Sequence, residues 1–240
     1  MKLIFIRHGE PNYETGCLTK QGVLEAEALT KVIDNMKIDN IYVSPLLRAE
    51  QTCSIAIKNT NHKPITLPYL EEFVHKMDVP YKSDKMITWD LPPRFLTTQK
   101  DLYNYDTFLD NKYLKTGDIK AHYNNVINSF DNLLKEHGYN RVDYYYEVIN
   151  ENEKTLVFFC HFGVICVILS HLLNLPYVIL THAFCALPSS ITEVVTEERE
   201  KGIAQFRCIR FGDLSHLKLA NIKESFHARF CETFSSKDRH

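Results

Sequence analysis

The chain has few of the features that mark nucleic-acid-binding, disulfide-stapled or zinc-binding proteins. Its 28 basic and 30 acidic side chains give a formal net charge of −2 over 240 residues. This balance predicts neither a nucleic-acid surface nor a polybasic membrane anchor. The seven cysteines include no CxxC pair, and an odd number fits neither a disulfide framework nor a zinc knuckle. We therefore expect a reducing, cytoplasmic location, with no nucleic acid as a partner.

Signals for export, membrane insertion and nucleotide loops are also missing. Arg7 and His8 interrupt the N-terminal apolar run after five residues, which does not fit a signal peptide. Residues 156–180 are apolar enough to resemble a membrane span, but they contain polar side chains and a proline, so a buried strand followed by a buried helix explains them better. The sequence has no Walker A motif and no GxGxxG. We expect no membrane partner and no glycine-rich phosphate loop.

What the sequence does contain is an alternation of strands and helices. Short apolar runs predict strands at residues 2–6, 41–43, 63–67 and 154–160. Apolar stripes at helical spacing predict helices capped by Thr19 and by Ser44, and two more over residues 118–137 and 163–173. This alternation predicts a parallel sheet with right-handed crossovers. Residues 190–196 and 203–211 are predicted to form a hairpin at the sheet edge.

A length of 240 residues allows one sizeable α/β domain or two small ones, and we predict a single domain over residues 1–240. Regular signals fade between residues 74 and 117, where prolines, aromatic residues and charges mix. We expect an insertion or cap region within residues 74–150. A lid over a substrate and a decoration that covers a sheet edge both remain open for its aromatic part.

Three short segments at strand ends or helix starts carry side chains suited to phosphate chemistry. They are Arg7-His8-Gly9, Ser44 to Arg48, and His161-Phe162-Gly163. Ligands bind at the carboxyl ends of strands in open α/β sheets, where helix N-termini add free N–H groups. A histidine there can attack phosphorus while guanidinium groups hold the oxygens. Alone, the Arg-His pair would only end a strand, but a second apolar strand ends in His161 in the same way.

These segments resemble the histidine phosphatase superfamily, with its phosphoglycerate mutase-like fold. The motifs that carry the resemblance are Arg7-His8-Gly9-Glu10, Leu18-Thr19 with Gly22, Ser44-Pro45-Leu46-Leu47-Arg48-Ala49 with Gln51-Thr52, Leu70-Glu71-Glu72, and His161-Phe162-Gly163. They follow the family's order between residues 7 and 163. The resemblance implies a three-layer α/β sandwich: a mostly parallel central sheet flanked by helices, with an insertion over the carboxyl ends of the strands.

The resemblance also implies roles for individual residues. His8 would be the nucleophile and become phosphohistidine, while Arg7, Arg48 and His161 would hold the transferring oxygens. Glu72 would be the acid that protonates the leaving oxygen, with Glu71 as a rival that the sequence does not exclude. No metal and no cofactor are required. The partner would be a phosphorylated small molecule, and the oligomeric state stays open, a dimer being one option.

Three departures from the family pattern favour a phosphatase over a mutase. Pro11 follows Glu10 where the mutases have Ser or Thr, although Asn12 is a candidate substitute for their asparagine. The loop from Glu10 to Leu18 is short, and Phe162 stands where the family often has glycine. The expected function is therefore metal-independent hydrolysis of a phosphomonoester. Phosphoglycerate mutase-type transfer and non-catalytic binding of a phospholigand are the alternatives.

Two further histidines are expected to be structural. His171 lies on an apolar helix, where a hydrogen-bonded core residue is a better explanation than a ligand. His182 is expected in a loop near the pocket rim, with a place in the pocket wall as the alternative.

Overall fold

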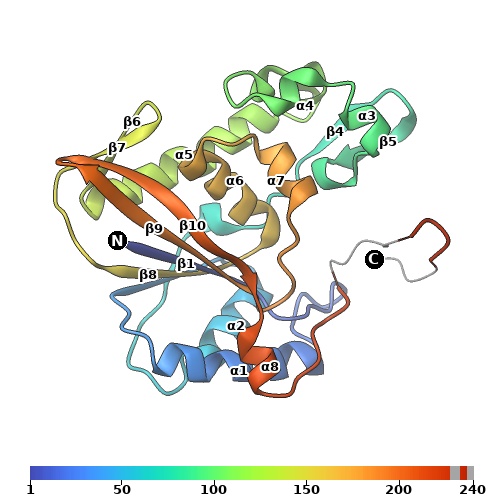
Figure 1. Ribbon diagram of the computed structural model, residues 1–240. Helices are drawn as coiled ribbons and strands as arrows, with labels where there is room; N and C mark the ends of the chain where they lie inside the picture. The colour runs from blue at the N-terminus through green and yellow to red at the C-terminus, as the bar shows by residue number, and fades with distance from the viewer. Residues whose placement is uncertain (228–232, 237–240) are drawn as a thin grey trace.

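The computed structural model describes residues 1–227 and 233–236, and its centre is an eight-stranded sheet in the order β3-β2-β8-β1-β9-β10-β7-β6 (Figure 1). The strands are β1 (Lys2–Arg7), β2 (Asn40–Val43), β3 (Ile65–Thr66), β6 (Tyr139–Val142), β7 (Tyr145–Val148), β8 (Thr155–Cys160), β9 (Ile191–Glu200) and β10 (Ile203–Asp213). The pairs β3-β2, β2-β8 and β8-β1 are parallel, and the remaining pairs are antiparallel. Only β9 and β7 therefore run against the other strands of this sheet, and the predicted mostly parallel sheet is confirmed.

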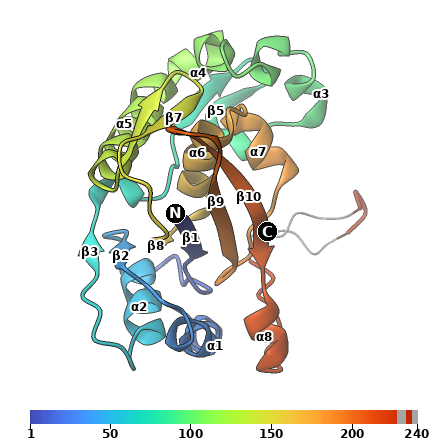
Figure 2. The same ribbon diagram turned by 60° about the vertical axis from the view of Figure 1, so that its left-hand side comes forward.

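Helices cover both faces of the sheet, as the sequence predicts. One layer holds α1 (Lys20–Asp34), α2 (Leu47–Ala56) and α8 (Ser215–Leu219), and the other holds α5 (Ile119–Glu136), α6 (Phe162–Leu173) and α7 (Tyr177–Ala183) (Figures 1 and 2). The α/β sandwich of three layers is thus confirmed. Sequence patterns did not predict α7, whose seven residues are too few for a helical period to be recognised.

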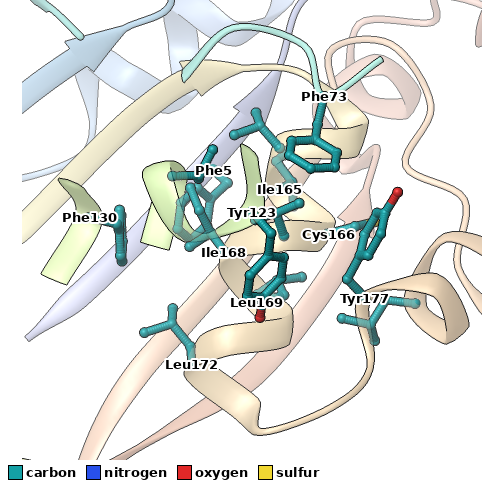
Figure 3. Close-up of a cluster of buried hydrophobic side chains, with 14 of the residues drawn as sticks. Phe5, Phe73, Tyr123, Phe130, Ile165, Cys166, Ile168, Leu169, Leu172 and Tyr177 are labelled. Carbon is teal, nitrogen blue, oxygen red and sulfur yellow. The ribbon is translucent and has the colours of Figure 1, made fainter. Parts of the chain in front are cut away.

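Alternation along β1 explains why both helix layers hold. Phe5 faces α5 and α6, where its ring stacks on Phe158 with 5.0 Å between centroids and lies 6.2 Å from Phe130. Figure 3 shows Phe5 and Phe130 beside the α6 side chains. Ile4 and Ile6 point to the opposite face and join a second cluster with α1 and α2. Both faces of β1 are buried, which explains why the strand is apolar from Leu3 to Ile6.

The hairpin of β9 and β10 is not at the edge of the sheet, so that prediction is wrong. Beyond it, β7 pairs with β10, and β6 forms the edge. The tyrosine-rich segment of β6 and β7 was not predicted as strand, because its burial depends on tertiary partners. The ring of Tyr146 packs edge-on against Phe206 at 5.0 Å, and its hydroxyl donates to Asp131 on α5.

Residues that follow β3 leave the main sheet and form a separate group of short elements. They are the hairpin β4 (Lys76–Val79) and β5 (Lys82–Ile87), helices α3 (Pro93–Leu96) and α4 (Lys112–Thr116), and the 3₁₀ turns η1 (Pro68–Leu70), η2 (Thr88–Asp90), η3 (Lys100–Tyr103) and η4 (Phe108–Asp110). Of the predicted cap region 74–150, the part up to about residue 117 stands outside the main sheet, since α5 covers that sheet and β6-β7 extend it. A single domain over residues 1–240 stays a prediction.

The predicted helix starts have different outcomes. Thr19 is the N-cap of α1, as predicted, and its hydroxyl accepts from the Gly22 amide at 3.0 Å. Ser44 is not a helix cap, because α2 begins at Leu47 with no side-chain cap. The run 156–180 forms β8, α6 and the start of α7, and no helix in the described part of the chain has both the length and the apolarity to cross a membrane.

Candidate active site

A pocket of about 340 Å³ opens where β1 ends, and it collects residues from distant parts of the chain. Its lining consists of Arg7, Tyr13, Arg48, Glu72, Val74, Trp89, Asp90, Phe162, Cys185 and Ala186. Three of the predicted site residues, Arg7, Arg48 and Glu72, are in this lining. The imidazoles of His8 and His161 lie beneath it, buried, with 4.9 Å between their ring centroids.

His8 is held in the tautomer that a nucleophile needs. Its Nδ1 lies 2.7 Å from the carbonyl oxygen of Gly9, which can only accept, so Nδ1 carries the proton. Nε2 is then unprotonated, and its lone pair accepts from Nε of Arg48 at 3.2 Å. Burial, with Arg7 and then Arg48 nearby, keeps the pKa of His8 well below its usual value. His8 is therefore a neutral imidazole whose Nε2 faces the guanidinium.

The backbone around His8 packs directly against the start of α1. A Cβ added at Gly9 would lie 2.6 Å from the Gly22 carbonyl oxygen, and one at Gly22 would lie 2.2 Å from that of Glu10. Only glycine allows two backbones this close. The hydroxyl of Thr52 accepts from the Gly9 amide at 2.9 Å and donates to the Arg48 carbonyl at 2.7 Å. One side chain thus ties the His8 loop to the helix that carries Arg48.

His161 stands at the N-cap position of α6, where β8 ends, and Ser44 orients it. The Ser44 hydroxyl lies 2.7 Å from Nε2 of His161 and also accepts from the Leu46 amide at 3.3 Å. When the Ser44 hydroxyl donates to Nε2, the ring proton of His161 lies on Nδ1. Burial first, and then the neighbouring His8, lower the pKa of His161 well below its usual value. Its Nδ1 is buried and has no hydrogen-bond partner within residues 1–227 and 233–236.

The guanidinium group of Arg7 has one nitrogen that is hydrogen-bonded to the backbone and one that is available to a ligand. One terminal nitrogen donates to the carbonyl oxygen of Ala186 at 2.5 Å, and the guanidinium lies 5.9 Å from the ring centroid of Phe162. Its Nε is buried and has no hydrogen-bond partner in the described part of the chain. A buried polar group without a partner costs about 1–3 kcal/mol. An oxyanion that accepts from Nε of Arg7 and from Nδ1 of His161 would remove this cost at both atoms.

Glu72 is one of two carboxyl groups in the pocket lining, the other being Asp90, and its neighbour Glu71 is exposed. Oε1 of Glu72 accepts from the amides of Gly163 at 2.7 Å and Phe73 at 2.9 Å. The ring of Phe73 is buried and lies 5.4 Å from that of Tyr177, in the cluster that Figure 3 shows. Burial raises the pKa of Glu72 against the opposing effects of Arg7 and of the two amides. This geometry favours Glu72 over Glu71 as a proton donor.

Other sequence predictions lie outside the pocket. Asn12 is not in the pocket lining; its side-chain oxygen accepts from the amides of Glu14 and Thr15, and the neighbouring Tyr13 lines the pocket. His182 is on α7 and not in a loop, and its Nε2 lies 2.8 Å from the carbonyl oxygen of Thr88. His171 pairs with Asp131 at 2.7 Å, as expected for a satisfied core histidine.

Sequence reasoning missed several members of the site. Trp89 and Asp90 lie in a segment whose aromatic content was evident, but no periodicity showed which of its side chains face the pocket. Ser44 was expected to cap a helix, but its hydroxyl is hydrogen-bonded to His161. The carbonyl of Ala186 had no signal in the sequence. Within residues 1–227 and 233–236, no three His, Cys, Asp or Glu side chains gather closely enough to hold a metal ion.

Comparison with known sequences relates the N-terminal part of the chain to one family. Residues 3–101 match the family model of the histidine phosphatase superfamily (branch 1). The chain is also 39% identical over 74 residues to the 2,3-bisphosphoglycerate-dependent phosphoglycerate mutase 2 of Arabidopsis thaliana. That match covers 27% of this chain and 22% of the plant protein, so it spans less than a quarter of its relative.

Solved structures share the fold over most of the chain. A phosphoserine phosphatase from Entamoeba histolytica, in complex with 3-phosphoglyceric acid, superposes with a TM-score of 0.57 at 20% identity over 90% of this chain and 98% of its own. An alpha-ribazole phosphatase from Shigella flexneri gives a TM-score of 0.55 at 18% identity over 89% and 96% of the two chains. The chain thus resembles the histidine phosphatase superfamily over residues 3–101, and it shares the fold of these two phosphatases over most of its length.

Proposed function

We propose that this chain is a metal-independent phosphatase that hydrolyses a phosphomonoester through a phosphohistidine on His8. One observation carries the proposal: His8 presents an unprotonated Nε2 beside Arg48, and two buried polar atoms nearby, Nε of Arg7 and Nδ1 of His161, have no partner among the residues that the structure describes. Phosphoryl transfer requires mainly positioning and stabilisation of charge, and these groups supply both.

In the first step, Nε2 of His8 attacks phosphorus as the bond between phosphorus and the ester oxygen breaks. Arg7, Arg48 and His161 hold the three non-bridging oxygens. The carboxylic acid of Glu72 donates its proton to the departing oxygen, so an alcohol leaves. The raised pKa of Glu72 keeps this proton available at a higher pH than an exposed glutamate would.

In the second step, the carboxylate of Glu72 takes a proton from a water molecule that attacks phosphorus. The bond between nitrogen and phosphorus breaks, which releases inorganic phosphate and restores neutral His8 and protonated Glu72. The low pKa of His8 suits both steps, because the neutral ring is the nucleophile before transfer and the leaving group after it.

Arg48 has to change partner during this cycle. It donates from Nε to Nε2 of His8, and this bond occupies the lone pair that must attack phosphorus. An arriving phosphate dianion is a stronger acceptor than a neutral imidazole, so it draws the guanidinium away from His8. Substrate binding thereby exposes the nucleophile.

The main alternative is a mutase, supported by the partial identity with plant phosphoglycerate mutases. A mutase returns the phosphoryl group to a second position of the sugar acid and needs a bisphosphate primer. The short loop between Glu10 and Leu18 and the ring of Phe162 in the pocket lining favour a phosphatase. Non-catalytic binding of a phospholigand is less well supported, because Glu72 and both histidines have the geometry of a reacting set.

The proposal includes a phosphorylated small molecule as the partner. It also includes a cytoplasmic location, based on the seven cysteines without a disulfide pattern.

The test is release of phosphate from p-nitrophenyl phosphate in the presence of EDTA by the wild type, His8→Ala and His62→Ala. His62 lies in the segment between α2 and β3, away from the pocket, and is a matched control. We expect turnover that EDTA leaves unchanged, that is lost in His8→Ala and that persists in His62→Ala. Turnover by His8→Ala, or its loss with EDTA, would contradict the mechanism. A parallel assay of 2- and 3-phosphoglycerate interconversion, with a bisphosphate primer, identifies a mutase.

A further inference from the structure

The pocket has two chemically different sides. We call Arg7, His8, Arg48 and His161 the phosphate site, and the side formed by Val74, Trp89 and Asp90 the wall. Trp89 is half-buried, and its ring meets Phe162 edge-on with 6.0 Å between centroids. A Cβ added at Gly163 would lie 2.9 Å from Cζ3 of Trp89 and 2.7 Å from Oε1 of Glu72. The indole thus stands next to the turn that holds the acid, where the body of a bound ester has to lie.

The wall is fixed in place before any ligand arrives. Trp89 and Asp90 belong to the turn η2, whose first residue, Thr88, is fully buried. The hydroxyl of Thr88 bonds to that of Tyr177 on α7, and its carbonyl oxygen lies 2.8 Å from Nε2 of His182. Both partners belong to a helix of the main body. A prebuilt aromatic surface favours a rigid, planar ligand, because little ordering is required on binding.

The charges of the lining are divided between the phosphate site and the wall. Both cations of the lining, Arg7 and Arg48, stand at the phosphate site, where one phosphate dianion would use them. The wall adds no cation but presents the carboxylate of Asp90, which is exposed and makes no ion pair within the described residues. A second anionic group on the substrate would meet Asp90 without a cation to neutralise it, whereas an ammonium group would be attracted.

We propose that the substrate is a phosphomonoester with a planar aromatic body whose far end carries an ammonium or another cationic donor, and that Asp90 and Trp89 select it. This inference rests on the proposed function, since the phosphate is placed by the catalytic residues. It excludes phosphorylated sugar acids as preferred substrates, because their carboxylate would face Asp90.

The first test compares two aryl phosphates that differ only in the charge at the far end. One is tyramine phosphate, with an ammonium group, and the other is 3-(4-phosphonooxyphenyl)propionate, with a carboxylate. Their leaving groups are nearly the same, so the ratio of kcat/KM reports the wall alone, and the amount of folded enzyme cancels from it. We expect the wild type to prefer the ammonium compound about tenfold, with the preference falling as salt screens the exposed Asp90.

Asp90→Asn keeps the shape of the side chain and removes its charge, so the two substrates should become nearly equal. Asp84→Asn, on β5 and outside the pocket lining, is the matched control and should keep the wild-type ratio. Equal rates with the wild type, or an unchanged ratio in Asp90→Asn, would overturn the assignment of Asp90. If the wild type hydrolyses neither compound nor p-nitrophenyl phosphate, the proposed function itself fails.

The second test concerns the aromatic body. Tyramine phosphate and phosphoethanolamine share the phosphate and the ammonium group, but only the former has a ring to lie on Trp89. Trp89→Leu should lower the ratio of their kcat/KM values several-fold relative to the wild type. The leaving-group difference is the same for both enzymes and cancels in this comparison. A ratio that Trp89→Leu leaves unchanged would overturn the aromatic part of the proposal.

Discussion

The phosphate site and the wall of the pocket are built from different kinds of structure. His8 and His161 follow β1 and β8, two strands buried on both sides by helix layers, and Arg48 stands at the start of α2, which covers one face of the sheet. Trp89 and Asp90 come from a 3₁₀ turn in a group of short elements outside the main sheet. On the proposed function, the rigid strands hold the reacting side chains in place. The sequence of the short turn can change without disturbing them, so the turn can determine which ester binds.

The largest effect expected from this difference is that damage to the phosphate site acts on every substrate alike. Arg48→Ala removes a guanidinium that holds the transferring oxygens and faces Nε2 of His8. We expect kcat/KM to fall about 10³-fold, equally for aryl and alkyl phosphates, because preorganised charge of this kind is worth roughly 10²–10³ in rate. Arg94→Ala, an exposed arginine of α3, is the control. A fall in kcat/KM that differs between aryl and alkyl phosphates would contradict the separation of the phosphate site from the wall.

Glu25 on α1 supports the loop after His8, and it should make the stability of the protein depend on pH. Glu25 is fully buried, and its Oε2 accepts from the amide of Glu10 at 2.7 Å. Burial raises the pKa of Glu25 to about 7. The folded protein thus binds a proton that the unfolded chain releases, so the free energy of unfolding falls as the pH rises from about 4.5 to about 7, by roughly 3 kcal/mol.

Glu25→Gln keeps the acceptor for the Glu10 amide and removes this titration. Near pH 5 the variant should unfold in urea at nearly the wild-type concentration, and at pH 8 it should be more stable than the wild type by that amount. The same stability difference at both pH values would show that Glu25 does not titrate in this range.

Glu72→Gln should separate the chemistry of the acid from binding. The loss in kcat should be about 10²-fold for an alkyl phosphate, whose departing oxygen needs a proton, and smaller for p-nitrophenyl phosphate, whose phenolate leaves unaided. Because the proton donor is lost as the pH rises through the raised pKa of Glu72, wild-type hydrolysis of the alkyl ester should fall at high pH. The variant should lack this descending limb. Equal losses for both esters would exclude Glu72 as the proton donor.

Gly163→Ala has the smallest expected effect, and it affects both the phosphate site and the wall. The new methyl group would press on Oε1 of Glu72 and on the ring of Trp89. We expect kcat to fall about tenfold, together with a shift in the ratio of tyramine phosphate to phosphoethanolamine. Steady-state kinetics with both esters measures the two effects. A loss of kcat with an unchanged ratio would mean that wall and phosphate site move independently.

The sequence indicated which two histidines lie together because both follow strongly apolar strands, and the end of such a strand can be located. His8 and His161 were placed together for this reason, and their rings are neighbours. Ser44 shows the limit of such reasoning, since a serine before a proline is typical of a helix cap, yet its hydroxyl is bound to His161. Only tertiary contacts decide between these two uses.

The wall and the antiparallel half of the sheet could not be predicted in the same way. An aromatic segment without periodicity does not show that Trp89 faces the pocket while Tyr81 packs on Phe95. The strands of residues 139–148 are short and partly polar, and their pairing depends on β10, which lies about 60 residues further along the chain. Long-range partners, and not local patterns, determine both features.

Detection of the covalent intermediate tests the central claim most directly. Glu72→Gln, which should slow the attack of water, is mixed with p-nitrophenyl phosphate, stopped at alkaline pH where phosphohistidine survives, and mapped by mass spectrometry. The account predicts phosphate on the peptide that contains His8, lost after acid treatment and absent from the Glu72→Gln/His8→Ala double variant. Phosphate release during turnover with this peptide unmodified, or with phosphate on another residue, would contradict it.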